Sequence, residues 1–259
     1  MGESALTLGY PELLAETAFA LGYGRDPEQW TVAQETEADL YVQSGLRQFY
    51  NPPAAAGEAP HAWHFFRPSE TLVTEADEQD YDAPDDFGGI EGDMTFAADE
   101  GREPIRVVPE GRIREFRQQG LTAGRPRYVA VRPKPFDPAI GQRFEFMFDR
   151  PADGVYNLSY QYHVIPPVKL DADSPYVYGG EAHSETVLAS CLAVVELRTE
   201  KQKGPMWDDF MGKLAASIAA DRRSLRPAFL GYNGDHSGSR GADRLPRSER
   251  LVTYNGLSY

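Results

Sequence analysis

The hydrophobic pattern is most regular between residues 184 and 226, where it predicts two helices. In the first, apolar residues recur three and four positions apart, the spacing of a helix that buries one broad face: Val187, Leu188, Cys191, Leu192, Val194 and Val195. A break at 203–205 precedes a second run: Trp207, Phe210, Met211, Leu214, Ala215, Ile218 and Ala219. Two antiparallel helices with so short a turn need further helices to cover their apolar surface.

The covering helices are predicted at the N-terminal end. Pro11 would open a short helix that ends at Gly22 or Gly24, with these residues inward: Leu13, Leu14, Thr17, Ala18 and Leu21. A second helix follows Trp30, starts with a capping box of Thr31 and Gln34, and must stop at 51–53, Asn-Pro-Pro. Its expected inward side is Val32, Val42, Gly45, Leu46 and Phe49. Residues 52–62 would be a flexible connection.

Between these helices the pattern changes to the short alternating runs that are typical of strands. Strands are predicted at 71–74, 105–108, 112–116 and 128–131. The runs 143–148 and 155–162 flank a turn-like segment and are predicted to pair as a hairpin. The fold class is therefore α+β: a four-helix-type bundle made from N- and C-terminal halves, with an inserted antiparallel β domain and an extended C-terminal arm. Expected boundaries are 1–62 and 181–231 for the two bundle halves, 63–180 for the β domain and 232–259 for the arm.

Charge is distributed unevenly along the 259 residues, whose formal net charge is −14. Residues 1–100 hold 21 acids against three arginines, or −18, whereas the remaining 19 acids and 23 bases give +4. The acidic part would repel nucleic-acid phosphates. Either it is a solvated face, or the two ends of the chain meet different neighbours in an assembly. No apolar run approaches the length of a membrane span, and no export signal is expected.

The residues that could carry chemistry favour structural roles. Cys191 is the only cysteine and falls on an apolar helix face, which favours an inert buried thiol. His61 and His64 have helical metal-pair spacing but no cysteine or carboxylate set nearby, so a polar cap on the Trp63 anchor is preferred. Helix capping is preferred for the group around the next helix start: Glu181, His183 and Glu185.

The acidic loop near residue 80 could be imagined as a glycosidase acid pair or a calcium loop, but no pair is singled out and the EF-hand spacing is absent. No phosphate loop or nucleophile elbow is present either. We therefore expect no enzymatic activity, no cofactor and no metal. The arginines of the C-terminal arm could touch nucleic acid, but pairing with acids of a neighbouring chain is preferred, because acids are interleaved with them.

Taken together, the order of motifs resembles the head-to-tail adaptor proteins of tailed bacteriophages, also called head-completion or connector proteins. The resemblance covers about residues 10–232 and rests on these stretches: Trp30, the helix end 46–52, Trp63-His64-Phe65-Phe66, the segment 81–87, Gly124-Arg125-Pro126, the strand 151–162, and the long helix pair ending in Leu230-Gly231-Tyr232.

This resemblance implies a structural virion protein: a ring, a dodecamer as a rule, at the portal vertex. The ring would extend the DNA channel and serve as docking platform for the neck and tail. Implied partners are other copies of the chain, the portal protein, a downstream neck or tail-completion protein, and double-stranded DNA passing without specific binding; no membrane is involved. Assembly would occur in the host cytoplasm.

Two sets of residues receive roles on this reading. The portal-binding set is Arg240, Arg244, Arg247, Arg250, Leu251, Val252 and Tyr254. The acidic set, expected to line the channel and repel DNA, is Asp77, Glu78, Asp80, Asp82, Asp85 and Asp86. Two alternatives stay open: a tail-tube or nozzle ring protein of a short-tailed phage, and a virion-associated glycan-binding or glycan-cleaving β module.

Overall fold

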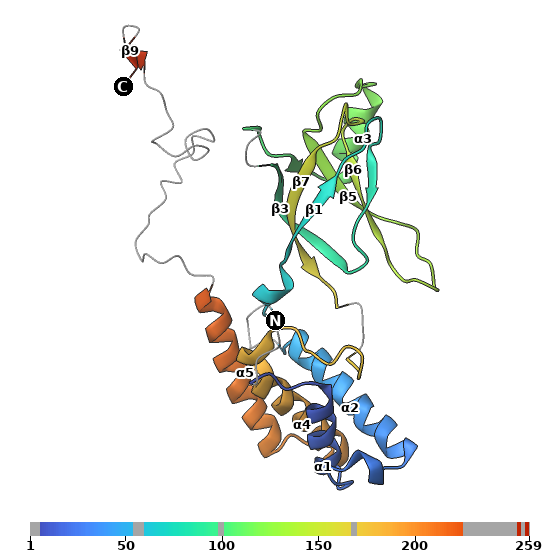
Figure 1. Cartoon of the computed structure of the whole chain (residues 1–259), viewed down its shortest axis with the longest axis vertical. Helices are drawn as coiled ribbons and strands as arrows, with labels where there is room; N and C mark the ends of the chain where they lie inside the picture. The colour runs from blue at the N-terminus through green and yellow to red at the C-terminus, as the bar shows by residue number, and fades with distance from the viewer. Residues whose placement is uncertain are drawn as a thin grey trace. The chain divides into compact units, whose positions relative to one another are not determined.

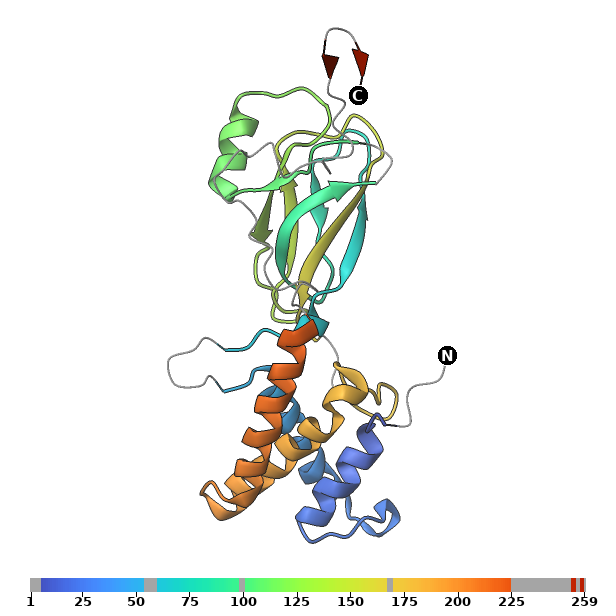
Figure 2. The same cartoon turned by 90° about the vertical axis from the view of Figure 1, so that its left-hand side faces the viewer.

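A computed structural model describes residues 6–53, 60–97, 101–166 and 170–224, and the backbone of 253–254 and 257–258. The fold is α+β (Figures 1 and 2). The helices are α1 (Tyr10–Ala20), α2 (Val32–Tyr50), α3 (Glu110–Gln118), α4 (Ser184–Glu200) and α5 (Pro205–Ser224), with 3-10 turns η1 (Pro27–Gln29), η2 (His64–Phe66) and η3 (Gly180–His183). The chain divides into two compact units, Met1–Ser224 and Leu225–Tyr259.

Helix α4 is the element on which the other long helices pack, because it contacts α1, α2 and α5 (Figure 1). The sequence predicted one broad buried face, but α4 is buried on most of its circumference. Its small polar residues make this possible: Thr186 Oγ1 and Ser217 Oγ of α5 lie 2.7 Å apart, and Ser190 Oγ donates to Gly45 O at 2.8 Å. Polar groups between the apolar ones are thus satisfied inside the helical layer.

The ends of α2 follow the sequence prediction. Thr31 and Gln34 form the capping box, and the helix ends at Tyr50 before Asn51 and Pro52. The inward side is correct for Val42, Gly45, Leu46 and Phe49, but Val32 is 79% exposed. At 100° per residue, Val32 lies roughly a quarter turn away from the buried side, so it cannot reach α4.

The β region contains two sheets (Figure 1). One has the order β1-β7-β3, with strands β1 (Ser69–Val73), β7 (Asn157–Val164) and β3 (Phe87–Phe96), all antiparallel. The other has the order β2-β6-β5-β4, with strands β2 (Asp80–Asp82), β6 (Phe144–Phe148), β5 (Tyr128–Pro133) and β4 (Arg106–Val107). The sequence predicted an antiparallel β domain, but β4 pairs with β5 in parallel, so the second sheet is mixed.

The predicted hairpin between 143–148 and 155–162 is wrong, although both runs are strands. β6 pairs with β2 and β5, whereas β7 pairs with β1 and β3, so the two strands lie in different sheets. Their side chains meet across the interior: the rings of Phe146 and Tyr160 are 5.1 Å apart at a 72° angle. The connecting segment pairs elsewhere, since Thr74 N donates to Tyr156 O and Ala152 N donates to Glu78 O.

The strand predicted at 112–116 is also wrong, because these residues belong to α3. Its single fully buried side chain is Ile113, and Phe116 one turn later stacks on Tyr128 at 4.8 Å. Arg114 pairs with Glu110 at the i, i+4 spacing that favours a helix. The spacing of Ile113 and Phe116 and the ion pair within the helix therefore favour a helix over the strand that the short alternation of apolar and polar residues predicted.

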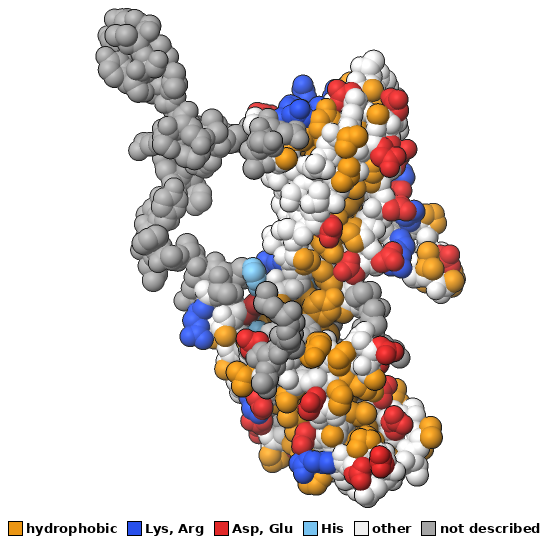
Figure 3. All heavy atoms as spheres, viewed as in Figure 1, with side chains coloured by type: hydrophobic (Ala, Val, Ile, Leu, Met, Phe, Trp, Pro, Cys, Tyr) orange, Lys and Arg blue, Asp and Glu red, His pale blue; other side chains and the backbone are white. Residues whose placement is uncertain are grey.

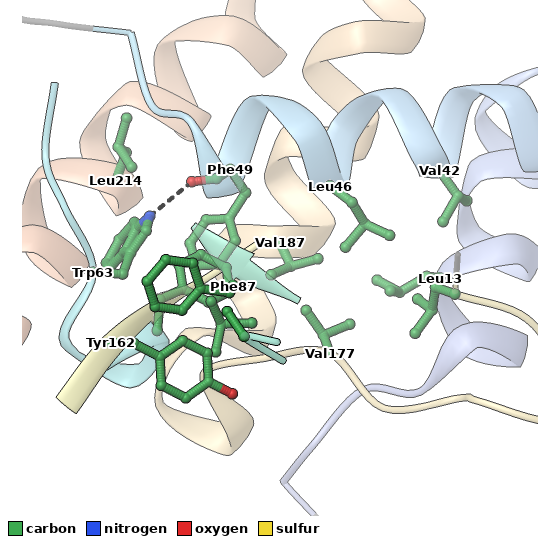
Figure 4. Close-up of a cluster of buried hydrophobic side chains, with 14 of the residues drawn as sticks. Leu13, Val42, Leu46, Phe49, Trp63, Phe87, Tyr162, Val177, Val187 and Leu214 are labelled. Carbon is green, nitrogen blue, oxygen red and sulfur yellow. Dashed lines mark hydrogen bonds between the residues drawn. The ribbon is translucent and has the colours of Figure 1, made fainter. Parts of the chain in front are cut away.

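One continuous cluster of buried side chains joins the helices to the sheets. In Figure 4, Phe87 and Tyr162 from the strands lie beside Phe49, Trp63 and Val187 from the helical region. The helical and β regions of residues 6–224 therefore share a core. In the second unit, β8 (Thr253–Tyr254) and β9 (Leu257–Ser258) form an antiparallel hairpin.

Candidate interaction surfaces

Trp63 anchors the chain where it passes from the helices to the first sheet. Its side chain is fully buried, and its Nε1–H donates to the carbonyl of Phe49 at 3.0 Å (Figure 4). The ring lies 4.7 Å from that of Phe49 and 5.3 Å from that of Phe65. The anchor role predicted for Trp63 is therefore confirmed.

The two histidines beside this anchor have different environments. His61 meets Trp63 edge-on at 4.9 Å, and its Nε2 lies 2.8 Å from Oδ2 of Asp221 on α5. His64 is exposed, but its backbone N–H donates to the same carboxylate. His61 thus has the capping position proposed for it, whereas the His64 side chain does not. In residues 6–224, outside the gaps, no group of three possible metal ligands occurs.

His183 has a packing role and not the predicted capping role. It precedes α4 without making a side-chain cap hydrogen bond, and its ring lies 5.2 Å from Trp63 and 5.5 Å from Phe65. Burial lowers the pKa of His183; nearby Asp221 raises it in part, and His61 lowers it further. The imidazole is therefore held neutral against aromatic rings.

The acidic stretch lies near basic residues that are distant in the sequence. Asp80 pairs with Arg117 at 2.7 Å, and Asp82 pairs with Lys134 at 2.7 Å. Asp85 pairs with Arg143 at 3.4 Å. Asp86 pairs with no base among the described residues and accepts a hydrogen bond from the hydroxyl of Tyr162 at 3.1 Å. Figure 3 shows acidic and basic side chains together along this edge of the β region. The excess of acids in residues 1–100 is thus partly neutralised by bases from the later part of the chain that lie beside them in the fold.

Asp77 and Glu78 occupy the turn before β2. Asp77 has a left-handed backbone with φ of 64° and donates its N–H to Ala152 O at 2.8 Å. Glu78 Oε1 accepts from the backbone N–H of Gln79 at 3.2 Å. Sequence reasoning grouped these two residues correctly with the acids of β2, but it did not identify the bases that face the strand.

The cysteine prediction agrees with the environment of this side chain. Cys191 is fully buried between α4 and α2, and burial raises the pKa of its thiol to about 12. A thiol with so high a pKa holds almost no thiolate at neutral pH.

Glu196 fixes the turn between α4 and α5, a role that sequence reasoning missed. Its carboxylate accepts backbone N–H groups from Gly204 at 3.0 Å, Met206 at 3.2 Å and Trp207 at 2.9 Å. Burial alone would raise the pKa of Glu196, but these three donors together lower it. The available indication was an acid near the C-terminal end of a helix, where the dipole disfavours it unless a following helix supplies donors.

A groove of about 560 Å³ lies between α2 and the segment that follows β7. Leu46, Arg47 and Tyr50 form one wall, and Ile165 and Tyr176 are on the other. Ile165 is 55% exposed and Tyr176 58%, so the groove presents apolar surface to solvent. The groove could not be predicted from the sequence, because its walls come from segments more than a hundred residues apart.

The portal-binding residues predicted in the arm lie outside the described part of the chain, except for the backbone of Tyr254 in β8. No helix in the described residues is long and apolar enough to cross a membrane.

Comparison with protein families decides what kind of protein these surfaces belong to. Residues 9–228 match the SU10 adaptor protein family, and this match spans both the helices and the sheets. The chain belongs to the SU10 adaptor protein family. This is a family of phage head-to-tail adaptors, as the resemblance in the sequence implied. A search of curated proteins found no match.

Membership in the SU10 adaptor family makes the protein a structural component of the phage virion. The family is not a known enzyme family, which agrees with the absence of a nucleophile elbow or phosphate loop from the sequence. An adaptor protein associates with portal and tail proteins.

Proposed function

We propose that this adaptor assembles as a ring, a dodecamer, below the portal, where it extends the DNA channel and provides the platform on which the neck or tail docks. The family match over residues 9–228 carries this proposal. A tail-tube or nozzle role is less well supported, because the matching family is one of head-to-tail adaptors.

The proposed organisation keeps the predicted segments. Residues 1–62 and 181–231 form the two halves of a four-helix-type bundle, 63–180 form the inserted β domain, and 232–259 form the arm. The burial of α4 by α1, α2 and α5 supports the bundle, since the first two helices and the last come from opposite ends of the chain. The shared core supports a rigid connection between bundle and β domain.

The arm is proposed to bind the portal through its basic and apolar residues: Arg240, Arg244, Arg247, Arg250, Leu251, Val252 and Tyr254. Opposite charge on the portal surface would steer this contact. The hairpin β8–β9 supports an arm with some structure of its own at its tip.

The acidic residues from Asp77 to Asp86 are proposed to face the channel. The bases that pair with Asp80, Asp82 and Asp85 reduce the repulsion that these residues exert on DNA. The repulsion therefore comes mainly from Asp77, Glu78 and Asp86, whose partner is the neutral hydroxyl of Tyr162. Such a channel wall would repel DNA enough to prevent adhesion. Because the repulsion is moderated by the bases, the electrostatic barrier to DNA passage would stay low. A cryo-EM map that puts β2 on the outer rim would refute this lining while leaving the ring intact.

Heads that lack this protein provide the direct test of the ring. Adding purified protein should produce a collar at one vertex in negative-stain images, and the collar should allow tails to join. A chain ending at residue 235 should remain folded but give no collar.

The matched arm variants carry four substitutions at Arg240, Arg244, Arg247 and Arg250, to Glu in one protein and to Lys in the other. The Lys variant should form collars and the Glu variant should not. Normal collars with the truncated chain would refute the arm's role, and absence of a collar with the intact chain would refute the adaptor ring.

A further inference from the structure

The connection between β5 and β6, residues 134–143, projects from the β region (Figure 1). Gly141 N–H donates to Asp137 O at 2.7 Å, and Ala139 N–H donates to Asp137 Oδ1 at 2.8 Å, which closes the tip into a tight turn. At its base, Lys134 N–H donates to Arg143 O at 2.8 Å. A tip held in this way loses little conformational freedom on binding.

Two large apolar side chains on this tip are left in solvent. Phe136 is 67% exposed and Ile140 is 59% exposed. Neither fills a cavity of its own chain, although each would be stabilised by burial. Single exposed apolar residues are ordinary on protein surfaces, but two on one ordered projection mark a contact surface.

The groove beside α2 is complementary to this tip in size, polarity and charge. Its volume of about 560 Å³ falls in the range of pockets that enclose large apolar groups, about 300–1,000 Å³. The wall residue Arg47 has no ion-pair partner among the described residues, whereas the tip carries Asp137, which has a second carboxylate oxygen available. The arm is a poorer occupant, because its arginines would face Arg47 with like charge.

We propose that the tip at 134–143 of one copy inserts into the groove of the next copy, with Phe136 and Ile140 against the apolar wall and Asp137 near Arg47. Tip and groove are different surfaces of one chain, so this contact is head-to-tail and generates a ring when the rotation closes. The inference rests on the proposed adaptor ring and names the surfaces that join its subunits.

Cross-linking between copies tests this contact directly. Ala139→Cys places a thiol on the tip, and Ser174→Cys places one on the rim of the groove. The native Cys191 is fully buried and serves as an unreactive background. Heads carrying collars are treated with a short bismaleimide and analysed on a denaturing gel.

Three samples distinguish a head-to-tail contact from accidental proximity. The double variant should give a ladder of multiples, an equal mixture of the two single variants should give dimers only, and either single variant alone should stay monomeric. Collars whose cysteines both react with a monofunctional maleimide but give no cross-link would overturn the proposal while the adaptor ring stands. A wild-type protein that forms no collar would overturn both.

A second test uses assembly itself. Phe136→Ser should raise the protein concentration at which half of the heads carry collars by at least about tenfold, since a tenfold change in affinity corresponds to loss of part of one buried aromatic contact. The matched control is Val155→Ser, because Val155 is 69% exposed and lies in the connection between β6 and β7. Equal collar formation by both variants would contradict the role of the tip.

Discussion

Helices α2 and α4 pack tightly at Gly45, where a single added methyl group provides a test of the packing. A Cβ on this residue would lie 2.6 Å from Cα of Cys191, 2.7 Å from its Sγ and 2.8 Å from its N. Two of these atoms belong to the backbone of α4, so the side chain of Cys191 cannot relieve the clash by rotating. The helices must separate, and the hydrogen bond from Ser190 Oγ to Gly45 O must lengthen with them.

The expected size follows from two opposing effects of Gly45→Ala. Alanine favours a helix over glycine by about 0.5–1 kcal/mol. Overpacking a close-packed interior costs about 1–3 kcal/mol, and contact with backbone atoms favours the upper half of that range. We therefore expect a net loss of about 1–2.5 kcal/mol in the free energy of unfolding.

The matched control is Gly212→Ala in α5, where a Cβ would meet nothing within 4 Å. Only the helix preference acts there, so this variant should gain about 0.5–1 kcal/mol. The free energies of unfolding of the two variants should then differ by about 1.5–3.5 kcal/mol. This corresponds to roughly 3–14 °C in Tm, at about 2–4 °C per kcal/mol for a chain of this size.

Urea unfolding followed by far-ultraviolet circular dichroism, at one protein concentration, measures both variants. Adding Cys191→Ala to Gly45→Ala should restore only part of the loss, because the contact with Cα remains. If Gly45→Ala proved as stable as Gly212→Ala, α2 and α4 would not cross at this distance and the packing described here would be wrong.

Further predictions concern the anchor, the pH dependence and α3. Trp63→Phe leaves the buried carbonyl of Phe49 unpaired and should cost about 1–3 kcal/mol in urea unfolding; an unchanged midpoint would contradict the anchor. The pKa of His183 is lowered by burial, so its contribution to stability is present above the ordinary value of 6.5 and is lost as pH falls through the folded-state pKa. His183→Phe should flatten the stability curve in that window, and an unaltered slope would refute this assignment. The pKa of Glu196 is likewise lowered, so a second decline begins below 4.5, and Glu196→Gln should remove it in thermal melts taken from pH 5 downward. Arg117 donates to Phe148 O, Gln79 O and Asp80, so Arg117→Met should cost about 1.5–3 kcal/mol and Arg117→Lys less, whereas equal melting of the two variants would argue against the multiple bonds.

The four long helices α1, α2, α4 and α5 were predictable because local chemistry determines where they start and stop. The capping box at Thr31 and Gln34 and the prolines after Asn51 act within one turn of the helix they bound, so the sequence suffices. The same holds for the break before Pro205, the first residue of α5. The strands β5, β6 and β7 were also found from alternation alone.

Strand pairing was not predictable, because alternation identifies a buried face but not its neighbour. β6 and β7 follow each other along the chain and both place aromatic residues inward, which fits a hairpin as well as two facing sheets. α3 was mistaken for a strand because a segment with Ile113 and Phe116 three residues apart satisfies both periods over so short a length.

The interaction surfaces were the least predictable part. The groove needs α2 beside residues 165–166 and 170–178, which follow β7. The basic partners of Asp80, Asp82 and Asp85 lie 37 to 58 positions away along the chain. No local rule connects Asp80 to Arg117 or Leu46 to Tyr176. The acidic stretch could be named from sequence, but the bases that moderate its charge could not.

The interleaved order of the helices also affects synthesis of the protein. Ser190 reaches Gly45 across 145 residues, so α1 and α2 leave the ribosome well before the helix that covers them exists. At about 5–20 residues per second, their apolar sides wait roughly 7 to 30 s for α4. During this interval the nascent chain exposes apolar surface of the kind that chaperones bind. The sheets between the two halves can form before the helical layer closes.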